Sequence, residues 1–208
     1  MLDTLVVVPR DTARYYDCAG TPRPERSTAH RVTLGALGRI TLMTPRSPEP
    51  RAAALLGLVV GEEVWAVVAP DADLAEADPA VTGGLYNAAL ALHNAHRLHG
   101  VSVGKIGKLL HLKRPALFPV LDRELRWRYD TRAAEQARRP ELVFRGYRQL
   151  HWGAVRADLG AWREAGAFPT LRGELAQDED RSGWGELTDL RLLDITAWSY
   201  EKGRTQAG

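Results

Sequence analysis

The sequence predicts an all-α protein of about eight helices, and three observations favour this class. Apolar residues recur at helical spacing along most of the chain. The alternation of apolar and polar residues that marks a strand is missing, and "TLVVV" near the start is the one short β-like run. With 208 residues, 45% of them apolar and 26% charged, the chain has the length and composition of one compact globular domain. We therefore expect a single helical domain over residues 1–208, with two small lobes around one core.

The first third of the chain predicts short helices at 33–42, 51–57 and 62–69. Thr33 is a suitable N-cap for the first of them. Pro70 ends the third, because proline lacks the amide hydrogen that a continuing helix needs. The residues that follow, "PDADLAEADPA", have the composition of a loop.

The central region predicts two consecutive helices. Residues 84–98 carry one apolar stripe, and Gly100 lies where a left-handed C-terminal cap is wanted. Ser102 can cap a second helix, which Pro115 ends. Two helices joined by a short glycine-containing hairpin form a helix-hairpin-helix, here over about 84–112.

The remaining elements follow from caps and periodicity. Asp122 stands where a helix over 123–138 should start. A longer helix is expected over 141–165. A C-terminal helix over about 187–202 closes the fold, with Gly203 after its end.

Charge is unevenly distributed, although the formal net charge is only +2. The basic segment 105–128 holds seven Lys or Arg against two acids, whereas 174–194 holds seven acids against two arginines. A basic segment of this kind is either a solvated helix face or a surface for an anionic partner.

The hairpin has the features of a phosphate site. Unpaired backbone N–H groups and the positive end of the helix dipole attract anions at the start of the second helix. Gly104 and Gly107 would let a phosphate backbone approach closely. Lys105 in the first turn opposes the dipole, which makes sense if an anion docks there. The alternative is that Gly100 is a cap, Gly107 packs against a neighbouring helix and the lysines are solvated.

Three stretches carry a resemblance to a known family: Gly100 to Arg126, "RYYD" at 14–17 and "LLDITAW" at 192–198. They resemble an uncharacterised bacterial family with a "KLL-x-x-KRP-x-L-x-PV-x-D" signature. The similarity runs over most of the chain, and it brings no established activity.

The same core more distantly resembles the helix-hairpin-helix DNA glycosylase superfamily. "LHGVSVGKIG" lies over that superfamily's hairpin pattern "LPGVGxKTA", and "FPVLDRELR" is similar to its "VDxHVxR" segment. The superfamily's aspartate lies eighteen residues beyond its lysine position, and counting back eighteen from Asp122 reaches Gly104. Lys105 is one residue off, about 100° around a helix, so it should not replace that lysine. The resemblance implies a monofunctional enzyme, or a descendant that lost catalysis, rather than a lyase.

On this resemblance the chain is a DNA-binding protein and a monofunctional base-excision N-glycosylase. Asp122 would stabilise the positive charge that develops on the sugar and orient the attacking water. The target base would be flipped into a pocket between the helices. The residues put forward for contact with double-stranded DNA are Gly100, Ser102, Gly104, Lys105, Lys108, Lys113, Arg114, Arg123 and Arg126. The alternative for Asp122 is a helix cap without chemistry.

Two further interpretations of function stay open. One is a non-catalytic nucleic-acid-binding or scaffolding protein that kept the fold and the cap. The other is an enzyme acting on a small nucleoside-like molecule, which the modest net charge favours because dedicated DNA binders are usually more basic. Trp127 and Tyr129 interleave with the arginines and either stack on a base or belong to the core.

No cofactor, metal or membrane contact is expected. His93, His96 and His99 spread over about 120° of a helix and offer at most a two-histidine site. The longest apolar stretch, 52–60, is too short to span a bilayer, and the first residues lack the basic start of a secretory signal. A cytoplasmic location is therefore the expectation.

Overall fold

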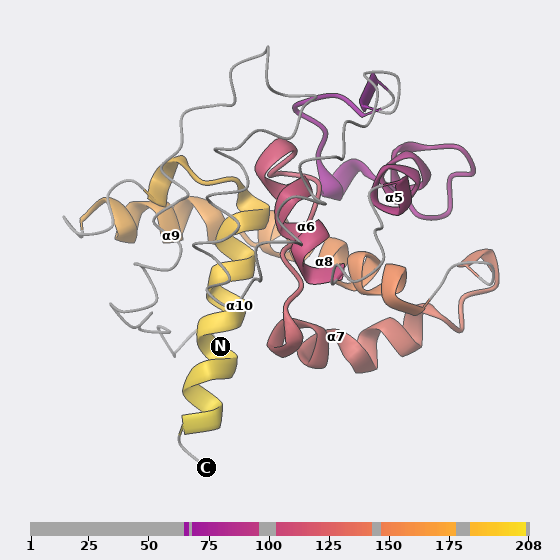
Figure 1. Ribbon diagram of the computed structural model, residues 1–208. Coiled ribbons are helices and arrows are strands. Elements are labelled where there is room, and N and C mark those ends of the chain that lie inside the picture. The colour runs from indigo at the N-terminus through magenta and orange to yellow at the C-terminus, as the bar shows by residue number, and fades with distance from the viewer. Residues whose placement is uncertain (1–64, 67, 96–102, 143–146, 178–183, 207–208) are drawn as a thin grey trace, which may run out of the picture.

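The computed structural model describes residues 65–66, 68–95, 103–142, 147–177 and 184–206 (Figure 1). Within these residues all regular structure is helical, which confirms the all-α class for this part of the chain. The elements are η3 (Leu74–Glu76), α5 (Leu85–Ala95), α6 (Val103–Lys113), α7 (Arg123–Gln136), η4 (Pro140–Leu142), α8 (Tyr147–Glu164), α9 (Ala167–Ala176) and α10 (Asp189–Gln206). The helices predicted at 33–42 and 51–57 lie outside the described residues.

The central prediction of consecutive helices is confirmed where the structure describes it. Helix α5 ends at Ala95, and residues 96–102, which include the predicted hairpin, lie outside the described part. Helix α6 ends at Lys113, just before Pro115, as the missing amide hydrogen of proline requires. Helix α7 begins directly after Asp122.

The region after α7 differs from the prediction of one helix over 141–165. Residues 140–142 form the single 3₁₀ turn η4, and α8 runs to Glu164. Gly166, with φ of 65°, is the N-cap of α9, a helix that the sequence analysis did not predict. Pro169 is the third residue of α9, in the first turn, where proline is tolerated because those amide hydrogens have no partner within the helix.

The predicted end of the C-terminal helix is wrong. Helix α10 continues through Gly203 to Gln206. A glycine inside a helix costs only about 1 kcal/mol relative to alanine, so a single one need not end it. The start is well defined, since the backbone N–H of Arg191 donates to Oγ1 of Thr188 at 3.2 Å.

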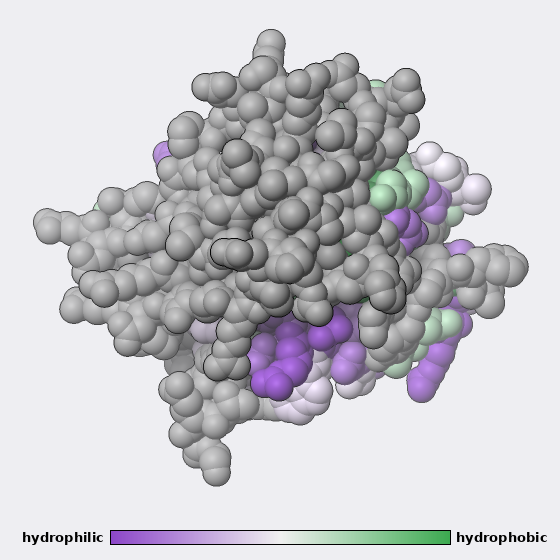
Figure 2. Space-filling model, in the orientation of Figure 1, coloured by the Kyte–Doolittle hydropathy of each residue, from purple (hydrophilic) through white to green (hydrophobic). Residues whose placement is uncertain are grey.

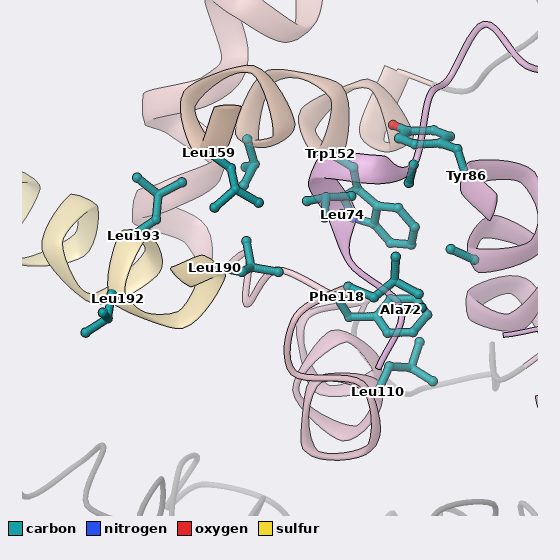
Figure 3. Close-up of a cluster of buried hydrophobic side chains, with 14 of the residues drawn as sticks. Ala72, Leu74, Tyr86, Leu110, Phe118, Trp152, Leu159, Leu190, Leu192 and Leu193 are labelled. Carbon is teal, nitrogen blue, oxygen red and sulfur yellow. The ribbon is translucent and has the colours of Figure 1, made fainter. Parts of the chain in front are cut away.

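The helices surround a large buried apolar cluster that extends from Trp65 to Ile195, and Ala133, Leu142 and Leu150 form a second, smaller cluster. Helix α7 packs against α8 and α10, α9 packs against α8, and α5 packs against α6 (Figure 1). Trp152 of α8 lies in the middle of the cluster (Figure 3), with its ring edge-on to those of Tyr86, His93 and Phe118 at centroid distances of 6.1, 5.4 and 5.5 Å. Edge-on aromatic pairs of this kind add to the stabilisation that burial provides.

Arginine side chains connect elements that are distant in sequence. Arg163 of α8 pairs with Asp73 at 2.6 Å and with Asp189 at 2.8 Å, and Arg172 of α9 pairs with Asp189 at 2.8 Å. Arg114 is fully buried, its Nε donates to the Val68 carbonyl at 3.1 Å, and its guanidinium lies 4.9 Å from the centre of the Trp65 ring. These contacts fix the ends of α8, α9 and α10 and the segment before η3.

Candidate functional site

The candidate site is built on the 118–122 segment (Phe118–Asp122), the extended stretch that leads from the turn after α6 into α7. It runs antiparallel to α6. A Cβ added at Gly104 would lie 3.6 Å from the Leu121 carbonyl oxygen, and one at Gly107 would lie 3.6 Å from that of Pro119. The two glycines therefore face the protein's own backbone, where an added Cβ would make an ordinary van der Waals contact.

One further side chain of α6 holds the beginning of the segment. His111 is buried, and its Nδ1–H donates to the Phe118 carbonyl at 2.8 Å. Burial and then the charge of Arg191 lower the pKa of His111 to about 3, against the hydrogen bond to Phe118. The imidazole is therefore neutral at physiological pH and serves as a hydrogen-bond donor to the backbone.

Helix α10 holds the segment from another side. Oδ2 of Asp194 accepts the backbone N–H of Val120 at 2.9 Å across 74 residues of sequence. One turn further along α10, the indole N–H of Trp198 donates to the carboxylate of Asp122. The Thr188 hydroxyl at the start of α10 donates to the Pro115 carbonyl at 3.0 Å. Both neighbouring helices thus fix the backbone from which Asp122 projects.

Asp122 is the N-cap of α7. Its backbone is extended, with φ of −79° and ψ of −170°, and Oδ1 accepts the N–H of Leu125 at 3.0 Å. Burial, with a contribution from the charge of Glu124, raises the pKa of Asp122 above its usual value, although the Leu125 hydrogen bond, the positive charge of Lys108 and the Trp198 hydrogen bond oppose this rise. The carboxyl is half-buried, with donors and a cation arranged around its ionised form.

Asp194 is the second carboxyl of the site, and it was not among the residues put forward from the sequence. It is 4% exposed. Burial, with a smaller contribution from the charge of Asp122, raises the pKa of Asp194 to about 7, in spite of Arg191 and the Val120 N–H. The half-buried Asp122 carboxyl thus acts electrostatically on a more deeply buried carboxyl that keeps its proton to near neutrality, and two carboxyls in such different environments are typical of acid and base pairs.

Three of the predicted basic residues lie around Asp122. Arg123 has a side chain 87% exposed and pairs with Glu124 at 3.3 Å. Arg126 is half-buried, and its Nε donates to the Asp122 carbonyl at 3.3 Å. Lys108 is half-buried and acts electrostatically on Asp122. Figure 2 shows hydrophilic surface over the region where the beginning of α7 lies in Figure 1.

Two of the other predicted contact residues are buried. Lys113 and Arg114 are 4% and 0% exposed, so their burial argues against the predicted surface contact with phosphates. The contact of the Arg114 guanidinium with the Trp65 ring and its hydrogen bond to the Val68 carbonyl explain the burial of this arginine. Gly100 and Ser102 lie outside the described residues. Lys105 is the third residue of α6, and only its backbone is described.

Of the two aromatic residues of α7, Trp127 is exposed and Tyr129 is buried. Trp127 is 58% exposed. Tyr129 is buried, and its hydroxyl donates to Asp158 of α8 at 3.0 Å. Burial and the neighbouring charge of Asp158 raise the pKa of Tyr129. Of this pair, only Trp127 is placed to meet a partner.

The sequence does contain a signal for Asp194. It lies on the same stripe of α10 as Leu190 and Ala197, both of which are buried. An acid on an apolar stripe needs a buried partner, because an unpaired carboxyl in a core is costly. Nothing in the sequence names Val120 as that partner.

The site therefore consists of the half-buried Asp122 carboxyl, on a backbone segment that α6 and α10 hold in place, together with the buried Asp194 carboxyl and nearby cations. Residues 7–201 match a family of unknown function, DUF6308, and the chain belongs to that family. This membership fits the expected uncharacterised family. Neither a curated protein nor a solved structure matches the chain. None of the helices in the described ranges combines the length and the apolar composition that a bilayer crossing requires.

Proposed function

We propose that this chain is a DNA-binding protein of the helix-hairpin-helix glycosylase type, a single helical domain that removes a base with Asp122. The observation that carries the proposal is the position of Asp122. It begins α7 at the end of a backbone segment held by both α6 and α10. The DNA glycosylase superfamily uses an aspartate that begins a helix at the corresponding place.

The eighteen-residue spacing between Gly104 and Asp122 supports this proposal. Gly104 is the second residue of α6, and the position of its Cβ lies 3.6 Å from the carbonyl oxygen of Leu121, the residue before Asp122. Gly104 thus lies close in space to the residue that precedes Asp122. A glycine at the lysine position offers no amine for a Schiff base, so hydrolysis without lyase activity is the expected chemistry.

In this proposal the carboxylate of Asp122 lies beside the sugar of an extruded nucleotide. As the base departs, positive charge develops on the sugar, and a nearby carboxylate stabilises it and orients the water that attacks the anomeric carbon. Lys108 and Arg123 are the described cations suited to the flanking phosphates, since one acts on Asp122 and the other is exposed next to it.

The test is excision from a set of duplexes that each carry one damaged or mismatched base, with formation of an abasic site as the readout. Asp122→Asn is the variant of choice, because asparagine caps a helix about as well as aspartate and separates chemistry from folding. It should bind DNA and lose turnover by at least about a hundredfold. Asp189→Asn, on α10 within the Arg163 and Arg172 ion pairs, is the matched control and should keep turnover. Equal turnover of Asp122→Asn and the wild type would contradict the proposal.

A second candidate function is a non-catalytic nucleic-acid-binding protein. The observation that favours it is the cap itself, since the hydrogen bond from Leu125 accounts for Asp122 without chemistry. Salt-sensitive DNA binding without excision from any substrate would select this candidate. An enzyme acting on a small nucleoside-like molecule would show neither property.

A further inference from the structure

Asp194 holds the backbone before α7, a contact that the Asp122 cap of α7 does not need. Its carboxyl reaches Val120, two residues before Asp122, from α10. Trp198, four residues after Asp194 on the same helix, holds the Asp122 carboxyl itself. One face of α10 therefore fixes both the backbone that leads to Asp122 and the side chain that would act.

The segment has little freedom to move around these contacts. The carbonyl of Phe118 accepts from His111, and the carbonyls of Pro119 and Leu121 pack on the bare faces of Gly107 and Gly104. The backbone N–H of Phe118 donates to the Arg114 carbonyl at 3.2 Å, and the N–H of Val120, in the middle of the segment, donates to Asp194. Loss of the bond to Asp194 would leave the buried N–H of Val120 unpaired and loosen the segment.

We propose that Asp194 is a positioning residue for Asp122: it holds the 118–122 segment through Val120, and the two carboxyls form one coupled acidic pair. Asp122 ionises first, because burial raises its pKa less than that of the more deeply buried Asp194, and Leu125, Lys108 and Trp198 favour its charged form. Burial, with a smaller contribution from the negative charge of Asp122, then keeps the proton on Asp194 up to about pH 7. As an account of base excision this role rests on the proposed function, whereas the coupling belongs to the protein alone.

The charged and titratable groups around the pair come from each element packed against it. Lys108 and Glu124 act on Asp122, while Arg191 acts on Asp194. Asp194 in turn acts on Tyr129, and Arg191 acts on His111. Because His111 is neutral and the Tyr129 hydroxyl keeps its proton, the charge that changes near neutral pH is that of Asp194.

The coupling is tested by NMR titration of the side-chain carboxyls in the full-length protein with ¹³C-labelled aspartate. In the wild type Asp194 should titrate at about pH 7. In Asp122→Asn its midpoint should move to lower pH, because the neighbouring negative charge is gone. Asp189→Asn removes a carboxylate from the same helix and should leave the midpoint where it was. An unchanged Asp194 midpoint in Asp122→Asn would overturn the pairing.

The positioning is tested by amide hydrogen exchange. In Asp194→Ala the amides of Val120 and Leu125 should exchange at least about tenfold faster than in the wild type. Asp194→Asn keeps an oxygen acceptor for Val120 and should restore slow exchange, even though it cannot titrate. If Asp194→Ala does not fold, Asp194→Asn decides by itself, and fast exchange of Val120 in that variant would refute the role. Neither experiment uses DNA, so failure here and failure of base excision are separate results.

Discussion

Asp122 is both a cap and a candidate catalytic group, and substitutions separate the two roles. Asp122→Ala removes the acceptor for the Leu125 N–H and should lower the free energy of unfolding by about 1 kcal/mol. Asp122→Asn should leave it within about 0.5 kcal/mol of the wild type. Urea unfolding of the three proteins measures both values. Equal losses in the two variants would mean that the negative charge, rather than the hydrogen bond, stabilises α7.

The buried carboxyl of Asp194 predicts an unusual dependence of stability on pH. Its pKa is about 7 in the folded protein, against 3.8 for an unperturbed aspartate. Between these values the folded state holds a proton that the unfolded state has lost. Stability should therefore fall as pH rises from about 4 to 7, by at most about 1.4 kcal/mol per pH unit, and this contribution is constant above pH 7.

Asp194→Asn tests this dependence, because the amide does not titrate. The difference in unfolding free energy between Asp194→Asn and the wild type should change in favour of the variant as pH rises from 4 to 7. Urea unfolding at several pH values measures it, with Asp189→Asn as the control for loss of a carboxylate on α10. A difference that stays constant over this range would contradict the buried, protonated state of Asp194.

At the scale of elements, Gly→Ala substitutions in α6 can be compared with one at a glycine where an added Cβ would meet no other atom. A Cβ at Gly104 or Gly107 would make an ordinary contact at 3.6 Å, and one at Gly160 of α8 would meet no atom within 4 Å. Each Gly→Ala change should therefore raise the unfolding free energy by up to about 1 kcal/mol, as helix propensity predicts. Gly107→Val should instead destabilise, because its added methyl groups press on the 118–122 segment.

The same variants test the phosphate interpretation of the hairpin. If a DNA backbone needs the bare surface of Gly104, Gly104→Ala should weaken DNA binding while it stabilises the fold, whereas Gly160→Ala should leave binding unchanged. Fluorescence anisotropy measures both affinities. Unchanged affinity in Gly104→Ala would mean that DNA binding does not use the bare surface of this glycine.

The elements that could be predicted are those with strong local signals. Asp122 and Pro115 mark the start of α7 and the end of α6 in sequence as they do in space. Helix α9 was missed because Gly166 and Pro169 resemble a loop in sequence, although one is a left-handed cap and the other lies in the first turn. Gly203 was taken as the end of α10 because a glycine at a helix end and one inside a helix look alike until the neighbouring structure is known.

At the scale of the whole molecule, the basic segment 105–128 divides into buried and exposed cations. Arg114→Met should lower the unfolding free energy by about 2–4 kcal/mol, because it leaves the buried Val68 carbonyl without its donor. Arg123→Ala, at a side chain 87% exposed, should change stability by less than about 0.5 kcal/mol. Thermal and urea unfolding distinguish the two, and similar losses would contradict the division.

Only the part of the site that local sequence features define could be predicted, as the two aspartates show. Asp122 was found because its cap, its spacing from Gly104 and its place before "RELR" are all local features. Asp194 was missed because its partner Val120 lies 74 residues away, and only the packing of α10 on α7 brings them together. The burial of Lys113 and Arg114 likewise depends on contacts made by the folded core.

The most direct test of the central claim compares two binding affinities, one for a duplex with an abasic-site analogue and one for the undamaged duplex. Fluorescence anisotropy measures both at low and moderate salt. The account predicts tighter binding of the abasic duplex, weakened by salt, with a salt slope smaller by about one in Arg123→Ala. Absence of binding at low salt would contradict it. Asp122 would then be a helix cap alone, and the search for a ligand would turn to small molecules.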